Sequence, residues 1–306
     1  MSSEGFESVF TTASDGCRLH ARIYGAHLED RLPALCLAGL TRNSTDFHDL
    51  ALALSGHKHR PRKVVSIDYR GRGLSGRDAD WRRYDPRIEC EDVLAQCTAL
   101  GIEEAAVVGT SRGGLVAMAI GAMRPAMLRA VVLNDIGPVI DSQGLIRIRG
   151  SVGKLPPPRS MHDAVAILRS VSDARFPGLS DEDWMALAQG TFRDDGGRLA
   201  PTYDTALMKG LAELDLDAPL PQLWSLFAGL NHVPVLAIRG ENSDLLSDKT
   251  LAAMEAAHPA CERWVVPGQG HAPLLRDAPT MNRIASFIAH AEDGRAGVKT
   301  PAEAGA

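Results

Sequence analysis

The chain alternates short apolar runs with stretches in which apolar residues recur at helical spacing. The apolar runs lie at 35–38, 64–67, 105–108, 130–133, 233–238 and 264–266. Helical patterns fall mostly between them, at about 45–55, 86–100, 112–123, 247–257 and 278–291. Short apolar runs separated by helices are typical of parallel strands that are buried on both faces. The pattern therefore predicts an α/β protein with a mostly parallel central sheet flanked by helices, preceded by a hairpin at 6–26.

The alternation stops between about 138 and 230, where helical patterns and large apolar residues replace it. We interpret 138–230 as an inserted helical cap over the sheet, with an ordinary second domain as the alternative. The core would then comprise 1–137 and 231–292, and 293–306 would be a flexible tail. The cap's aromatic residues either form its own core or line a substrate pocket, and three are expected in the pocket: Trp184, Phe192 and Trp224.

Composition and charge bear on the kind of partner to expect. The 306 residues are 45% hydrophobic and 23% charged, with a net charge of −5, which gives no reason to expect nucleic acid or a membrane surface as a partner. The chain start shows no signal-peptide pattern, and no apolar run is long enough to span a membrane. Five cysteines without metal-like spacing are expected to be reduced thiols. We expect a cytoplasmic protein without metal or cofactor, whose partner is a small-molecule substrate; a homodimer stays open.

The clearest chemical signal is a serine between glycines. Gly109-Thr-Ser-Arg-Gly113 follows the strand at 105–108 and begins the helix at 112–123. Such a strand-to-helix turn exposes the serine hydroxyl and aims the free N–H groups of the helix at it. A serine that merely capped the helix would not need glycines on both sides. We therefore expect Ser111 to be a nucleophile.

A serine nucleophile needs a base and a group that orients the base. Of the ten histidines, His271 follows an expected strand through a Gly-Gln-Gly turn, at the sheet edge where parallel sheets place ligand chemistry. Asp244, in the loop after 233–238, is our choice for the orienting acid. Asp135, after 130–133, is the alternative, although capping its own turn is the role we expect for it. Backbone N–H groups of Arg112 and Leu40 are expected to hold the oxyanion.

These motifs together resemble the α/β-hydrolase family. The resemblance covers about 6–292 apart from the cap, and rests on "GTSRGG", "RGENSD" and "GQGH" in the order Ser–acid–His. In addition, "SIDYRGRGLSG" is similar to the family's Asp-x-Arg-Gly-x-Gly-x-Ser loop. The resemblance implies a triad of Ser111, Asp244 and His271, with Leu40 and Arg112 at the oxyanion hole. The chain departs from the family at Ala38-Gly39, where His-Gly is common.

The sequence thus predicts a serine hydrolase that cleaves an ester or lactone of a small, fairly apolar molecule through an acyl-serine intermediate. Two alternatives stay open. The same triad could hydrolyse a carbon–carbon bond or an amide, and the cap arginines Arg147, Arg149 and Arg159 could hold a carboxylate for the former. The chain could also be a receptor that binds a ligand on a hydrolase scaffold without turnover.

Overall fold

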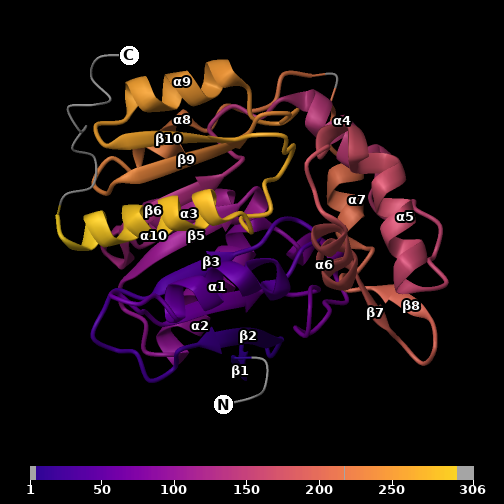
Figure 1. The fold of residues 1–306 in the computed structure, drawn as a ribbon, viewed down its shortest axis with the longest axis horizontal. Coiled ribbons are helices and arrows are strands. Elements are labelled where there is room, and N and C mark those ends of the chain that lie inside the picture. Colours follow the sequence, from indigo (N-terminus) through magenta and orange to yellow (C-terminus); the bar gives the residue numbers. More distant parts are fainter. Residues whose placement is uncertain (1–4, 217, 295–306) are drawn as a thin grey trace.

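The computed structural model describes residues 5–216 and 218–294, and its centre is one large sheet (Figure 1). Within this part of the chain, eight strands form that sheet in the order β1-β2-β4-β3-β5-β6-β9-β10. β2 is antiparallel to β1 and β4, and the remaining neighbours are parallel, which confirms the predicted sheet. The strands are β1 Glu7–Thr12, β2 Arg18–Tyr24, β3 Ala34–Leu37, β4 Val64–Asp68, β5 Ala105–Thr110, β6 Leu128–Asn134, β9 Val235–Gly240 and β10 Cys261–Val266.

Helices cover both faces of this sheet, as the alternating pattern predicts. One face carries α1 (His48–Ser55) and α10 (Ala278–Glu292); the other carries α2 (Pro86–Ala99), α3 (Arg112–Met123), α8 (Trp224–Ala228) and α9 (Asp248–Ala257). In β3, Leu35 and Leu37 pack into one apolar cluster and Ala34 and Cys36 into the other, all fully buried. A strand covered on both sides has no solvent face, and this is why its sequence is an unbroken apolar run.

The chain between β6 and α8 forms a separate group of helices beside the sheet, seen at the right of Figure 1. Its elements are α4 Ser142–Ser151, α5 Met161–Ser172, α6 Asp181–Thr191, the hairpin strands β7 Phe192–Asp194 and β8 Leu199–Pro201, and α7 Leu207–Ala212. We call residues 138–216 the inserted segment. It has its own apolar cluster, made by Ala164, Leu168, Phe176, Trp184, Ala188 and Phe192.

The inserted segment ends earlier than the sequence suggests. α8 packs against α3, and its Phe227 belongs to the apolar cluster of the sheet together with Leu230. The predicted cap boundary at 230 is therefore too late, because Phe227 of α8 belongs to the apolar cluster of the sheet. Of the tail expected at 293–306, only 293 and 294 lie within the described residues.

Two further observations concern the chain as a whole. All five cysteines are free thiols, and four of them are buried. Burial raises the pKa of Cys90, Cys97 and Cys261 to about 12, so these thiols stay protonated at neutral pH. Among residues 5–216 and 218–294, no helix has both the length and the apolar character required to cross a bilayer.

Candidate active site

Ser111 stands at the sharp turn between β5 and α3 that its sequence predicts. Its backbone has φ 51° and ψ −111°, a left-handed conformation that is uncommon for a residue with a side chain. The flanking glycines are required by crowding. A Cβ on Gly113 would lie 2.0 Å from the carbonyl oxygen of Leu37, and one on Gly109 would lie 2.5 Å from that of Gly113. The turn therefore holds the serine in place by close backbone contacts on both sides.

His271 contacts this serine from the loop that follows β10. Its Nε2 lies 2.9 Å from the Oγ of Ser111, and its side chain is only 7% exposed. The loop is tied to the end of β6, because Asn134 Nδ2 donates to the carbonyl oxygen of Pro273 at 2.9 Å. The two residues that the sequence singled out as nucleophile and base are thus within hydrogen-bond distance of each other.

Asp135 provides the carboxylate on the far side of the imidazole. Its Oδ2 lies 2.7 Å from His271 Nδ1, and its side chain is fully buried at the end of β6. The Ser243 hydroxyl also donates to Oδ2 at 2.6 Å, and the Gly240 N–H donates to Oδ1 at 2.8 Å. These donors satisfy the acceptor atoms of a carboxylate that is fully buried.

The structure does not place Asp244, our choice for the acid, on the histidine. Arg147 of α4 binds it instead, with Nη2 at 2.8 Å from Oδ1 and Nε on Oδ2. Burial alone would raise the pKa of Asp244, but the hydrogen bonds and charge of Arg147 hold it below its ordinary value. The difference has a physical reason: Asp135 and Asp244 lie in the loops that follow two neighbouring parallel strands, and the strand pattern does not show which of the two carboxylates binds another partner. Asp135, the alternative, occupies the expected position.

The segments expected to supply the oxyanion donors border the serine. Gly39 is so near that a Cβ on it would lie 3.9 Å from the Cβ of Ser111, and Leu40 follows directly. Arg112 is the first residue of α3, where the N–H groups of a helix have no partner within the helix. The roles of Leu40 and Arg112 stay predictions that this placement favours.

A cavity of about 260 Å³ adjoins Ser111 and His271 between the sheet and the inserted segment. The sheet side contributes loops that follow β3, β5 and β10, and the inserted segment contributes parts of α4, α5 and α6. The apolar side chains in its wall include Leu40, Phe47, Ile148, Phe176, Leu187 and Leu274.

The three aromatic residues predicted to line this cavity lie elsewhere. Trp184 is 1% exposed in the core of the inserted segment, edge-on to Phe176. Trp224 packs against Phe227 over the sheet cluster. Phe192 lines a neighbouring cavity beside Leu155 and Leu168. Phe176 and Leu187 are lining residues that the sequence analysis missed, and composition could not separate them from residues of the segment's own core.

Three arginines in the cavity wall each have a carboxylate partner. Arg147 binds Asp244, and Arg276 forms ion pairs with Asp49 and Asp183. Arg42 binds Asp46 through Nε at 2.8 Å and also contacts Thr191. Among residues 5–216 and 218–294, no group of three His, Cys, Asp or Glu side chains could hold a metal ion. The site thus combines a hydrogen-bonded serine, histidine and aspartate with a cavity whose wall has both apolar and charged side chains.

Comparisons with known proteins identify the family of the fold. Residues 34–282 match the model of the alpha/beta hydrolase family. The chain is 32% identical over 254 residues to a 3-hydroxybutyrate-oligomer hydrolase of Cupriavidus necator, which covers 79% of this chain and 83% of the relative. It is 26% identical over 251 residues to a 2-(acetamidomethylene)succinate hydrolase of Mesorhizobium japonicum, covering 82% and 85%.

Solved structures give the same result. A crystal structure of an alpha/beta hydrolase from Novosphingobium aromaticivorans superposes with a TM-score of 0.82 at 36% identity, covering 92% of this chain and 98% of that one. The match to the family model covers residues 34–282, which is most of the chain. The chain therefore belongs to the alpha/beta hydrolase family.

Proposed function

We propose that this hydrolase cleaves a carboxylic ester or lactone of a small molecule through an acyl intermediate on Ser111. The observation that carries the proposal is the continuous hydrogen-bond chain from Ser111 Oγ through His271 to Asp135, at the wall of a cavity. A protein that only binds a ligand has no need for this chain, so the arrangement favours catalysis over the receptor alternative.

In the first half of the reaction, Ser111 Oγ attacks the ester carbonyl while His271 Nε2 takes its proton. Asp135, which accepts from Nδ1 at 2.7 Å, stabilises the imidazolium that forms. The N–H groups of Leu40 and Arg112 donate to the oxyanion. His271 then gives its proton to the departing alkoxide, and the acyl group stays on Ser111.

In the second half, His271 removes a proton from a water molecule, which attacks the acyl-serine. The second tetrahedral intermediate collapses, Ser111 regains its proton from His271, and the acid is released. Every proton passes through His271 Nε2, so none of these steps requires a metal or cofactor.

The cavity wall supports an ester of modest size. Its lining is partly apolar, and its arginines are already bound to carboxylates. Ion-paired arginines do not favour the carbon–carbon alternative, which would use a cation such as Arg147 to hold a substrate carboxylate. The relative named for 3-hydroxybutyrate oligomers, whose units are joined by esters, supports ester cleavage.

Amide hydrolysis is the second candidate, because one relative is named for a substrate that contains an acetamido group. The same serine, histidine and oxyanion donors serve amides and esters. The two candidates differ only in the leaving group that His271 must protonate. A panel of matched esters, lactones and amides separates them.

The test is hydrolysis of p-nitrophenyl butyrate by the purified protein and by Ser111→Ala. The variant should lose activity by about 10³-fold or more, since the serine acts as a unit with its base. A fluorophosphonate should label the wild type at Ser111. The control variant is Ser170→Ala, which changes an exposed serine of α5 and should keep full activity. Turnover in purified Ser111→Ala would remove the nucleophile assignment.

A further inference from the structure

A buried carboxylate lies behind the proposed oxyanion site and plays no part in the mechanism above. Glu89, on α2, has no exposed side-chain surface. Its Oε1 lies 2.7 Å from Nη1 of Arg72, and its Oε2 lies 2.7 Å from Nε of Arg112. Burial alone would raise the pKa of Glu89, but the two guanidinium groups together lower it. The side chain is therefore an ionised carboxylate that joins two arginines.

Each of these arginines is attached to one of the two segments expected to bind the oxyanion. Arg112 is expected to supply one of the N–H donors from its own backbone, and its side chain donates to the carbonyl oxygen of Tyr84 at 2.6 Å. Arg72 donates from Nε to the carbonyl oxygen of Leu40 at 2.8 Å. Leu40 is the residue expected to supply the other N–H donor.

We infer that Glu89 is a positioning residue that holds both oxyanion donors at a fixed separation, through Arg72 on one side and Arg112 on the other. The inference rests on the proposed function, because only a reaction with an oxyanion makes use of that separation. Catalysis by fixed donors depends on their placement before the reaction, and small displacements are costly.

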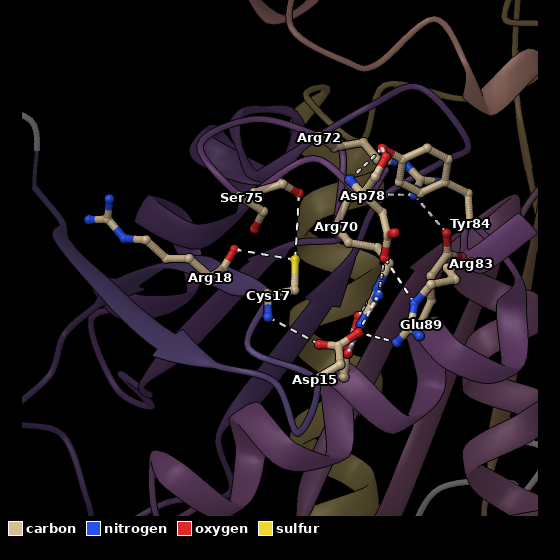
Figure 2. A network of polar contacts seen from close by, with 12 residues as sticks. Asp15, Cys17, Arg18, Arg70, Arg72, Ser75, Asp78, Arg83, Tyr84 and Glu89 are labelled. Atoms are coloured by element: carbon tan, nitrogen blue, oxygen red, sulfur yellow. Dashed lines mark hydrogen bonds and ion pairs between the residues drawn. The ribbon is translucent and has the colours of Figure 1, made fainter. Parts of the chain in front are cut away.

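The loop that carries Arg72 is itself anchored. Gly73 N–H donates to the carbonyl oxygen of Thr202, and Asp204 N–H donates to that of Gly71, both at 2.7 Å. Tyr84, which accepts from Arg112, donates its hydroxyl hydrogen to Asp204 Oδ2 at 2.7 Å. Arg72, Tyr84 and Glu89 are labelled in Figure 2. These bonds hold the loop against the inserted segment and so fix the position of Arg72, which binds the carbonyl oxygen of Leu40.

The sign of the effect separates positioning from simple electrostatics. Glu89 is negative, and an oxyanion nearby is destabilised by any negative charge. If Glu89 acted through its charge alone, neutralising it would speed the reaction. If it acts by holding Arg72 and Arg112, neutralising it slows the reaction, because the donors lose their fixed separation.

The same helix offers a matched control. Asp92 stands three residues after Glu89 on α2, is also buried, and binds Arg70 through two bonds of 2.6 and 2.7 Å. Arg70 also binds Asp15 and Asp78, part of the network in Figure 2. Asp92 thus gives α2 a second buried ion pair, and within residues 5–216 and 218–294 neither its side chain nor that of Arg70 bonds to Leu40 or Arg112.

The experiment compares Glu89→Gln with Asp92→Asn. For each we measure kcat, KM, thermal stability and the affinity for a trifluoromethyl ketone, which forms an oxyanion on the serine. Glu89→Gln should lower kcat and ketone affinity together by about 10- to 100-fold, with little change in KM. Asp92→Asn should lower stability without either effect. Equal losses in both variants, or an unchanged or faster Glu89→Gln, would overturn the inference.

A second variant covers the case in which Glu89→Gln does not fold. Arg112→Gln releases only one side of Glu89 at a partly exposed position and keeps the backbone N–H, and it should lower kcat and ketone affinity by about 10-fold. A folded Arg112→Gln with normal values for both would refute the positioning role. Fluorophosphonate labelling of the wild type separates the two failures: an unlabelled wild type refutes the proposed function itself, whereas equal labelling rates in wild type and Glu89→Gln refute only the inference.

Discussion

The loops after β6 and β9 lie side by side at the carboxyl ends of these neighbouring parallel strands, and each loop carries an aspartate. Asp135, after β6, is fully buried and binds His271, Ser243 and the Gly240 N–H. Asp244, after β9, keeps a side chain that is 24% exposed and binds Arg147 of the inserted segment. Donors from β9 and the loop after it hold Asp135 against the histidine, whereas Arg147 of α4 binds Asp244.

The two loops are also connected. Ser243, next to Asp244 in the chain, reaches back to Asp135, and Gly240 at the end of β9 does the same. The loop after β9 therefore contributes donors to the proposed triad without contributing its own carboxylate. An aspartate that follows a parallel strand at its carboxyl end is thus insufficient evidence for a catalytic role, because the donors and cations around the carboxylate decide its orientation.

The largest test of this comparison is Asp135→Asn. An amide at this position presents a donor to His271 Nδ1, which favours the tautomer whose Nε2 cannot accept the serine proton. We expect kcat for a p-nitrophenyl ester to fall on the order of 10³- to 10⁴-fold. Asp244→Asn, measured beside it, should fall by less than about 10-fold, and the reverse ranking would return the acid to Asp244.

Much of the fold could be predicted from the sequence because it depends on local patterns. The apolar run at 105–108 and the glycines around Ser111 specify a buried strand and a sharp turn, and both are observed. His271 could be found because its turn directly follows a strand. These features need no knowledge of which distant segments meet.

The acid and the residues of the cavity wall could not be predicted, because they depend on which distant segments of the chain meet. The choice between Asp135 and Asp244 depends on Arg147, which binds Asp244 although the two lie 97 residues apart in the sequence. Trp184 and Phe176 belong to the same apolar cluster, yet only Phe176 also faces the cavity. Apolar composition shows that a residue is buried, but not which of two apolar surroundings receives it.

Ser243→Ala is the next test, and it removes one donor from Asp135. The hydroxyl donates to Oδ2 at 2.6 Å and accepts from the N–H groups of Leu245 and Leu246, so it is well oriented. A hydrogen bond to a charged group contributes about 1.5–3 kcal/mol, and we expect kcat to fall by about 10-fold with KM unchanged. The control is Ser247→Ala, which removes the N-cap of α9 and should lower stability by about 1 kcal/mol while kcat stays normal.

Arg147→Gln tests the other side of the comparison. The Arg147–Asp244 pair joins α4 to the loop after β9 at the cavity wall, so its loss should loosen the substrate site and leave the triad intact. We expect KM to rise a few-fold with little change in kcat, and the free energy of unfolding to change by about 1 kcal/mol or less. Arg149→Gln, two residues further along the helix, should leave both constants unchanged. A large loss of kcat in Arg147→Gln would show that the pair acts on the chemistry.

The smallest expected effect is on the pH dependence of stability. The pKa of Asp244 is below its ordinary value near 3.8, so its ion pair stabilises the fold above that pH and loses its effect as the pH falls through the folded pKa. In urea unfolding at pH 6, the free energy of unfolding of the wild type should exceed that of Asp244→Asn by about 1 kcal/mol or less. This difference should disappear as the pH is lowered below 3.8. Asp15→Asn is the comparison: the hydrogen bond from Arg70 lowers the pKa of Asp15 to about 2, so its difference should persist to lower pH. If acidification increases the difference in the free energy of unfolding between wild type and Asp244→Asn, the ion pair with Arg147 is not the source of the stabilisation.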